Sequence, residues 1–187
     1  MLRNALFAAL LIATPALAEG DGPGPNLVIE VSGAANGQIV IDMNAEAAPK
    51  HVAQIVALAK SGAYDNVVFH RVIAGFMAQT GDVQYGRKGG DTSMAGMGGS
   101  DLPNIPAEFS QLPFERGTVG MARAQDPDSA NSQFFIMFAP GDFLNGQYTV
   151  IGKVISGMDV VDQIKLGEGQ NGEVTDPDVM TKVTVTE

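Results

Sequence analysis

Short runs rich in Val and Ile recur along the chain and are separated by Gly, Asn and Asp residues. Such runs are typical of β-strands joined by turns. The first two, residues 26–32 and 37–43, flank the turn residues Gly33 to Asn36 and predict a β-hairpin. Further strands are expected at residues 67–73, 76–80, 118–122, 133–138, 148–154 and 179–186.

Two amphipathic helices are expected between these strands. After Pro49, which suits a first helical turn, apolar residues recur at helical spacing until Gly62. Residues 157–164 predict a second, shorter helix. Because the strands are mostly consecutive, parallel winding is disfavoured. The pattern predicts a mainly β fold, a closed eight-stranded antiparallel β-barrel capped by two α-helices.

The N-terminus has the pattern of a cleaved secretory signal peptide over residues 1–18. Arg3 precedes an apolar stretch, residues 5–13, and Ala16-Leu17-Ala18 provides the small residues of a cleavage site. The apolar stretch is shorter than the about 20 residues that span a bilayer, so membrane insertion is not expected. A flexible leader is expected at residues 19–25 and one domain at 26–187. The protein is expected in the periplasm, with secretion as the alternative.

Composition excludes several functional classes. The chain has 187 residues and a net charge of -10, the wrong sign for binding nucleic acid. It has no Cys, which excludes disulfides and thiolate chemistry. Its two histidines, His51 and His70, lack a second ligand at a metal-binding spacing, so no metal site is expected. The loop from Gly86 to Gly99 lacks the end of a phosphate-binding motif, which favours a flexible connection.

One arginine stands out within an apolar strand. Because alternate strand residues share a face, Arg71 projects together with Phe69 and Ile73. An arginine among apolar side chains must be paired or functional. Periodicity alone leaves a structural role, held by an internal carboxylate, about as well supported as a site.

The segments around Arg71 carry a family resemblance. Phe69-His70-Arg71-Val72-Ile73, followed by Gly75-Phe76-Met77-x-Gln79-x-Gly81-Asp82, closely resembles the signature of the cyclophilin-type peptidyl-prolyl isomerases. Later blocks follow in the family's order: Gly120-Met121-Ala122-Arg123, Asn131-Ser132-Gln133-Phe134-Phe135-Ile136, Phe143-Leu144-Asn145-Gly146 and Val150-Ile151-Gly152-Lys153-Val154. The resemblance covers most of residues 27–185, and the Met-Ala-Arg version is similar to the bacterial branch.

The resemblance implies an eight-stranded antiparallel barrel with two end helices, and an enzyme that accelerates cis/trans rotation about X-Pro bonds. It implies no metal, nucleotide or other cofactor. Arg71 is the expected catalytic residue, as a donor to the prolyl nitrogen when rotation breaks amide conjugation. The resemblance implies these substrate-binding residues: Phe76, Met77, Gln79, Ala122, Arg123, Ala124, Gln133, Phe135, Phe143, Leu144 and Tyr148.

The implied roles of these residues differ. Phe76, Met77, Phe135 and Leu144 would grip the proline ring. Gln79 would orient Arg71 or bond the substrate backbone, and Gln133 would support the floor of the groove. The segment Ala122-Arg123-Ala124 would exchange main-chain hydrogen bonds with the peptide.

Two positions depart from the best-known eukaryotic members. Phe143 stands in place of Trp, which removes an indole donor, so only weak cyclosporin binding is expected. Tyr148 stands in place of His and keeps an aromatic wall with a polar tip. The expected partners are proline-containing polypeptides, among them unfolded exported proteins, and the protein is expected to be a monomer. The alternative function is a cyclophilin-fold peptide-binding module or holdase with incidental activity.

Overall fold

The computed structural model describes residues 21–187. The expected signal peptide, residues 1–18, and the first two residues of the expected leader lie outside this range. The rest of that leader, residues 21–25, runs beside the second strand. Gly22 donates its backbone N–H to Asp42 Oδ2 over 3.1 Å, and Pro25 accepts from the N–H of Met43 over 3.0 Å.

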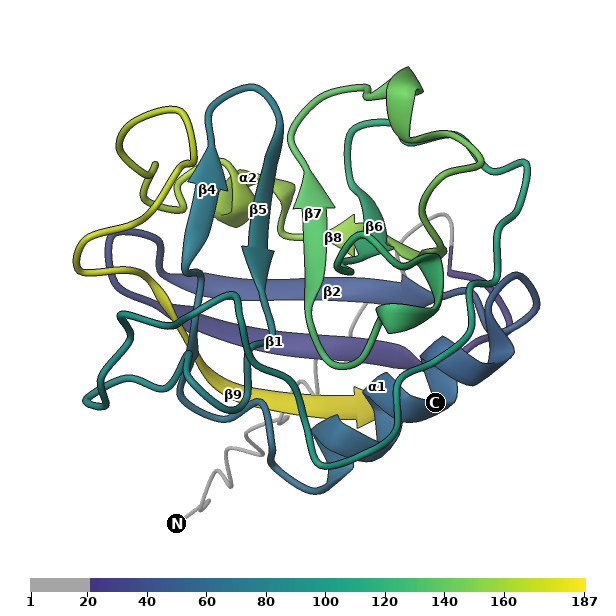
Figure 1. The fold of residues 1–187 in the computed structure, drawn as a ribbon, viewed down its shortest axis with the longest axis horizontal. Coiled ribbons are helices and arrows are strands. Elements are labelled where there is room, and N and C mark those ends of the chain that lie inside the picture. The colour runs from purple at the N-terminus through teal and green to yellow at the C-terminus, as the bar shows by residue number, and fades with distance from the viewer. Residues whose placement is uncertain (1–20) are drawn as a thin grey trace, which may run out of the picture.

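One antiparallel sheet curls around the core of the protein (Figure 1). The order of its strands is β3-β9-β1-β2-β8-β6-β7-β5-β4. Their bounds are β1 (Asn26–Ser32), β2 (Gly37–Met43), β3 (Val67–Val68), β4 (Arg71–Ile73), β5 (Met77–Thr80), β6 (Thr118–Met121), β7 (Phe134–Met137), β8 (Val150–Ser156) and β9 (Val179–Thr186). The mainly β class and the expected β1–β2 hairpin are confirmed.

The structure differs from the expected eight-stranded closed barrel in one region. The segment expected as a single strand, 67–73, forms two short strands that lie at opposite ends of the strand order. Val67 pairs with Met180 of β9, whereas Arg71 pairs with Gln79 of β5. The described residues form no ladder between β3 and β4, so the chain itself, through Phe69 and His70, joins the two edges.

Two α-helices accompany the sheet, as expected. Helix α1 (Pro49–Lys60) begins at the predicted proline and buries Val52, Ile55 and Leu58. Helix α2 (Met158–Val161) is shorter than the predicted 157–164. After Val161 the hydrogen bonds become 3₁₀-type, since the N–H of Ile164 donates to the carbonyl of Val161, three residues back. Ile164 is nevertheless buried, as predicted. Two 3₁₀ turns, η1 (Pro127–Ser129) and η2 (Asp142–Leu144), complete the elements.

A small second core of buried residues is separate from the main core. It consists of Met77, Phe114, Phe135, Met137, Leu144 and Val150. Gly120 makes its packing possible, since a Cβ there would lie 2.6 Å from the rings of both Phe114 and Phe135. Across residues 21–187, no helix has the length and apolar character needed to cross a bilayer.

Candidate active site

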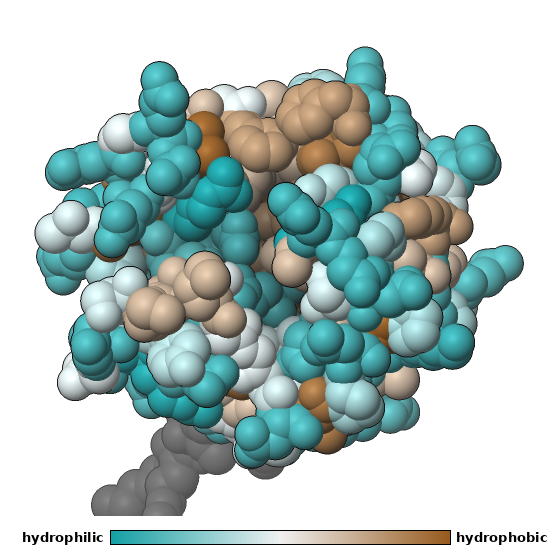
Figure 2. All heavy atoms as spheres, viewed as in Figure 1, coloured by the Kyte–Doolittle hydropathy of each residue, from teal (hydrophilic) through white to brown (hydrophobic). Residues whose placement is uncertain are grey.

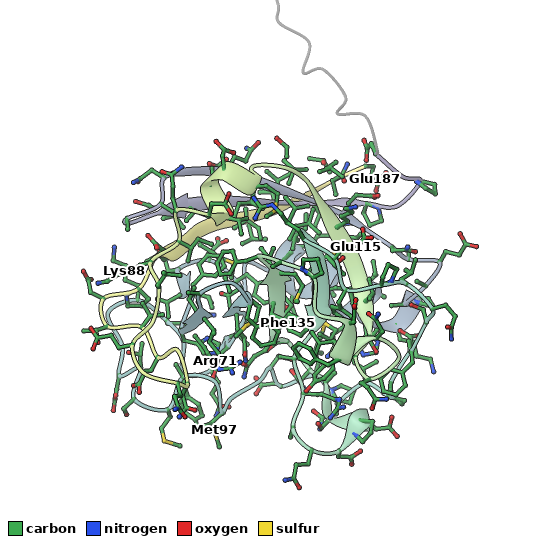
Figure 3. All side chains as sticks on the ribbon, turned by 90° about the horizontal axis from the view of Figure 1, so that it is seen from above. Arg71, Lys88, Met97, Glu115, Phe135 and Glu187 are labelled. Atoms are coloured by element: carbon green, nitrogen blue, oxygen red, sulfur yellow. The ribbon has the colours of Figure 1, made fainter. Side chains whose placement is uncertain are left out.

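The predicted site residues converge on a pocket of about 490 Å³ above this second core. The pocket is lined by Arg71, Phe76, Met77, Gln79, Ala122, Arg123, Phe135, Phe143, Leu144, Gln147 and Tyr148. Figure 3 shows Arg71 and Phe135 close together on the same side of the ribbon, with Met97 further out. Ten predicted residues therefore meet in one hollow, and Gln147 is an additional lining residue that the sequence analysis missed.

Aromatic side chains form the apolar end of the pocket. Phe135 is 5% exposed, stacks on Phe114 at 5.8 Å between ring centroids, and meets Tyr148 edge-on at 6.0 Å. Phe76 packs against Phe143 at 5.5 Å. Phe143 is 70% exposed and forms the rim. Figure 2 shows apolar side chains gathered at the upper edge of this face. Such a wall suits a compact apolar ring and displaces water.

Arg71 adds a charged group to this lining, in register with Gln79 and, through it, with Phe135 on the neighbouring strands. Its Nε donates to the carbonyl of Asn171 over 2.9 Å, and its Nη1 donates to Gln79 Oε1 over 3.1 Å. Gln79 Nε2 in turn donates to Gln133 Oε1 over 2.9 Å. The structure therefore supports the orienting role expected for Gln79, and it gives Arg71 no internal carboxylate among the hydrogen bonds of the described residues.

Burial affects the pKa values of the two basic groups here, Arg71 and His70. It lowers the pKa of Arg71. An arginine nevertheless stays protonated throughout the physiological range. Burial lowers the pKa of the neighbouring His70 to about 4. The site therefore presents one permanent cation beside a neutral imidazole at neutral pH.

The backbone of the 122–124 segment is only partly free to bind a peptide. Ala122 donates its N–H to the carbonyl of Gln133 over 2.9 Å, and Ala124 donates to Ser129 Oγ over 2.9 Å. Among the hydrogen bonds of residues 21–187, none uses the backbone N–H or C=O of Arg123. No hydrogen bond of the described residues uses the carbonyl of Ala122 either, so the free main-chain groups here are that carbonyl and both backbone groups of Arg123.

The guanidinium of Arg123 has a local role. It lies 4.4 Å from the centroid of the Tyr148 ring and donates to the carbonyls of Ala124 and Gln147, each over 2.9 Å. These contacts join the 123–124 segment to the 147–148 segment at the border of the pocket. The stacking on Tyr148 is a cation–π interaction, which stabilises the wall expected from that residue.

A second hollow of about 270 Å³ adjoins the first. It contains the two remaining predicted residues, Ala124 and Gln133, and is also lined by Gly96, Met97, Gly98, Ser129, Asn131 and Ser132. The sequence predicts only a flexible connection at residues 86–99, so this contribution of the loop to the site was not expected. The buried Asp82 in the Gly81-Asp82 motif, which accepts hydrogen bonds from the N–H groups of Gly96 and Gly98, is the signal that could have revealed it.

The described residues contain no group of three or more His, Cys, Asp or Glu side chains placed to hold a metal ion. The pocket itself is formed by apolar side chains, a fixed guanidinium and a free stretch of backbone. These groups can bind an extended peptide and donate hydrogen bonds to it.

Comparison with known proteins agrees with this geometry. The family model described as "Cyclophilin type peptidyl-prolyl cis-trans isomerase/CLD" matches residues 27–185. A probable peptidyl-prolyl cis-trans isomerase of Brucella suis is 54% identical over 187 residues, which cover 98% of this chain and 94% of that protein. A probable peptidyl-prolyl cis-trans isomerase of Brucella abortus shows the same identity and coverage.

Solved structures share the fold. The cyclophilin AquaCyp293 from Hirschia baltica aligns with a TM-score of 0.70 and 26% identity, over 85% of this chain and 73% of that chain. A cyclophilin-type isomerase from Cryptosporidium parvum, crystallised in the presence of the dipeptide Ala-Pro, aligns with a TM-score of 0.74 and 26% identity, over 87% and 99%. The chain therefore belongs to the cyclophilin-type peptidyl-prolyl cis-trans isomerases and acts on proline-containing peptides.

Proposed function

We propose that Arg71 is the catalytic residue of this isomerase and that its clients are exported proteins. Rotation about an X-Pro bond is slow because amide resonance gives a barrier of about 18–20 kcal/mol. In the twisted transition state the prolyl nitrogen becomes pyramidal and regains a lone pair. A donor to that lone pair stabilises the transition state and not the planar ground state, so it lowers the barrier.

The position of the Arg71 guanidinium carries this proposal. Asn171 and Gln79 hold its Nε and Nη1 in the lining of the pocket that the aromatic residues also form. Within the described part of the chain, Nη2 has no hydrogen-bond partner. A proline ring between Phe76, Met77 and Phe135 would therefore present its nitrogen to a donor that is fixed in place and still free to act.

The apolar pocket supports the same step. The planar amide is more polar than the twisted one, because resonance separates charge between its oxygen and nitrogen. Removing water from around the proline therefore favours rotation. The free backbone groups of Arg123 would hold the residue before proline, and main-chain recognition accounts for broad substrate tolerance.

Substitution of Arg71 tests the catalytic role. The protein without residues 1–18 and its Arg71→Ala variant are compared in the isomerisation of a short Ala-Pro peptide, with thermal melts of both. We expect a loss of about 10²–10³-fold in kcat/KM, since one preorganised transition-state donor is removed. The melting temperature should change little, because the Arg71 side chain is only half-buried.

An Arg71→Lys variant serves as the control for charge. Lysine keeps the positive charge but cannot bond Asn171 and Gln79 at the same time as the proline, so it should restore only a small part of the activity. A folded Arg71→Ala variant with the activity of the unsubstituted protein would refute the catalytic role.

The proposed clients follow from the pattern of residues 1–18, which supports export to the periplasm. Expression of the full chain, followed by cell fractionation and mass spectrometry, tests this. We expect a periplasmic protein beginning at Glu19, and retention of the full chain when Ala16 and Ala18 are replaced by bulky residues. Recovery of the processed chain from the medium would indicate secretion, and an unprocessed cytoplasmic chain would contradict the proposal.

A further inference from the structure

A buried carboxylate lies just beyond the end of β5. Asp82 is 0% exposed and accepts four backbone N–H groups. Its Oδ1 accepts from Gln84 over 3.1 Å and Tyr85 over 2.8 Å. Its Oδ2 accepts from Gly96 over 2.7 Å and Gly98 over 2.9 Å. Such bonds compensate the burial of a charge, so Asp82 holds residues 96–98 against the end of the strand that carries Gln79.

Residues 96–98 in turn determine how the side chain of Gln133 is oriented. The carbonyls of Gly96 and Gly98 lie 3.0 and 2.8 Å from Gln133 Nε2. A carbonyl can only accept a hydrogen bond, so the NH₂ group of Gln133 must face this segment. The oxygen of Gln133 must then face the neighbouring side chain, that of Gln79.

This orientation passes along the network to Arg71. Because Gln133 presents its oxygen, Gln79 must turn its NH₂ group toward Gln133, over 2.9 Å. The Oε1 of Gln79 is then left to accept from Arg71 Nη1, over 3.1 Å. With the amide of Gln133 reversed, the NH₂ group of Gln79 would face the guanidinium, and two donors would repel each other.

We propose that Asp82 is a positioning residue of the isomerase, acting through residues 96–98, Gln133 and Gln79 to fix the guanidinium of Arg71. The inference rests on the proposed catalytic role of Arg71. Asp82 does not touch the substrate pocket, since it lines neither of the two hollows beside Arg71 and Gln133. If Asp82 did not hold residues 96–98, Arg71 would keep its hydrogen bond to Asn171 but lose the one to Gln79, which sets the direction of the guanidinium.

Two substitutions disturb this arrangement by different means. Asp82→Asn replaces one acceptor oxygen with an NH₂ group, so the side chain can no longer accept from both pairs of N–H groups. Gly98→Ala leaves Asp82 intact but introduces a Cβ 2.5 Å from its Oδ1 and 2.8 Å from Tyr85 Cδ2, which must displace residues 96–98.

Each substitution has a matched control. Asp178→Asn alters another buried aspartate, 1% exposed, which accepts from the N–H groups of Ala35 over 2.9 Å and Lys165 over 2.6 Å. Asp178→Asn should reduce stability because it, too, removes an acceptor from buried backbone N–H groups. It should leave the hydrogen bonds among Gln133, Gln79 and Arg71 unchanged. Gly90→Ala lies in the same loop as Gly98, and its added Cβ comes no closer than 3.4 Å to another residue.

The experiment measures kcat and KM for a short Ala-Pro peptide, together with melting temperature. NMR signals of the Gln79 and Gln133 side-chain amides and the Arg71 Nε–H report the geometry. We expect Asp82→Asn and Gly98→Ala to lower kcat by about tenfold or more, since small displacements of a catalytic group have effects of that size. KM should change less than kcat, and all three sets of signals should shift. Both controls should keep the original kcat and signals.

The outcomes separate this inference from the proposed function. If Arg71→Ala is inactive while folded Asp82→Asn and Gly98→Ala keep full kcat, the positioning role is overturned and the role of Arg71 stands. If Arg71→Ala is fully active, the proposed function fails. If Asp82→Asn does not fold, Gly98→Ala against Gly90→Ala decides the question. An equal loss of kcat in Asp178→Asn would contradict the inference, because lowered stability would then explain the effect.

Discussion

At the scale of single residues, His70 is a buried neutral base next to Arg71, the proposed catalytic residue. His70 is 7% exposed, and neither nitrogen of its ring has a hydrogen-bond partner among residues 21–187. Burial lowers its pKa to about 4, although the carboxylate of Asp82 opposes the shift. A protonated His70 would place a second positive charge next to Arg71 in the chain. The fold therefore favours the neutral form.

This pKa predicts how stability depends on pH. In the unfolded chain His70 has its ordinary pKa of 6.5, so between pH 6.5 and about 4 the unfolded chain binds a proton that the folded protein does not. The free energy of unfolding should therefore fall as pH decreases through this range. The contribution of His70 is on the order of 1–3 kcal/mol. Urea unfolding of the protein and of His70→Gln, from pH 7 to pH 4, measures it.

The comparison between the two proteins isolates His70 from other groups. Asp65, Glu108 and Asp162 have lowered pKa values, so both proteins lose some stability in acid. The His70→Gln variant should show the shallower loss below pH 6.5. Identical slopes in the two proteins would mean that His70 titrates in the folded protein as it does in the unfolded chain.

The sequence allowed part of the site to be predicted at this scale. Arg71 is conspicuous because strand alternation places it among apolar residues, yet only the family resemblance distinguished a catalytic from a structural role. Asp82 and residues 96–98 were missed because their contacts join residues 14 and 16 positions apart through a loop of irregular conformation. The local sequence shows Asp82 as a carboxylate just after an apolar strand, but it does not identify partners so far along the chain.

At the scale of elements, β4 is the last strand of the sheet, and the segment of residues 167–174 covers its free edge. Val72 donates its N–H to the carbonyl of Gly172 over 2.7 Å and accepts from Gly167 over 2.9 Å. The same segment provides the carbonyl of Asn171 that accepts from Arg71 Nε. Covering the edge thus protects it from pairing with other chains and also positions the side chain of Arg71.

Substitution of Gly172 tests this double role. Gly172 has a φ of +70°, and an added Cβ would lie 2.5 Å from Ile73 Cγ1 and 2.8 Å from the carbonyl oxygen of Val72. Gly172→Ala should therefore push the segment away from β4 and move Asn171. We expect a loss of about 1–3 kcal/mol in the free energy of unfolding, together with a lower kcat. Denaturant unfolding and the peptide assay measure the two effects.

Gly169→Ala is the matched control for this substitution. Gly169 has a φ of +65°, so alanine brings similar backbone strain, but nothing lies within 4 Å of the added Cβ. It should cost less stability than Gly172→Ala and leave kcat unchanged. Equal effects of the two substitutions would attribute the loss to backbone strain and not to the contact with β4.

Most elements could be predicted from hydrophobic periodicity, and the exceptions have physical causes. The 67–73 segment has one continuous apolar pattern, but its halves pair with strands on opposite edges of the sheet. The start of α1 is another case. Ala48 has no capping side chain, and the carboxylate of Glu108 instead accepts from the N–H groups of Lys50 and His51, over 3.1 Å each. Nothing near Pro49 in the sequence indicates a partner so far along the chain.

At the scale of the whole molecule, the net charge of -10 contrasts with the two arginines that border the pocket. Arg71 bonds to Gln79 and Asn171, and Arg123 lies over the Tyr148 ring, so both positive charges are fixed beside the pocket by uncharged partners. At low ionic strength a peptide that is still outside the pocket responds to the net negative charge of the whole protein. Screening acts over about 30 Å at 0.01 M salt but over only about 10 Å at 0.1 M. A positively charged peptide should therefore be attracted before it reaches the pocket.

Peptides that share one Ala-Pro core and differ only in flanking Lys, Gln or Glu residues test this effect. At 0.01 M salt we expect kcat/KM to decrease in the order Lys, Gln, Glu, and the differences to narrow as salt is raised to about 0.3 M. The rates for the Gln peptide provide the control for effects of salt on the enzyme itself. The reverse order would show that Arg71 and Arg123 dominate the field that a client meets. If the order holds, the acidic surface selects basic clients by encounter, while the pocket recognises only the proline and the backbone beside it.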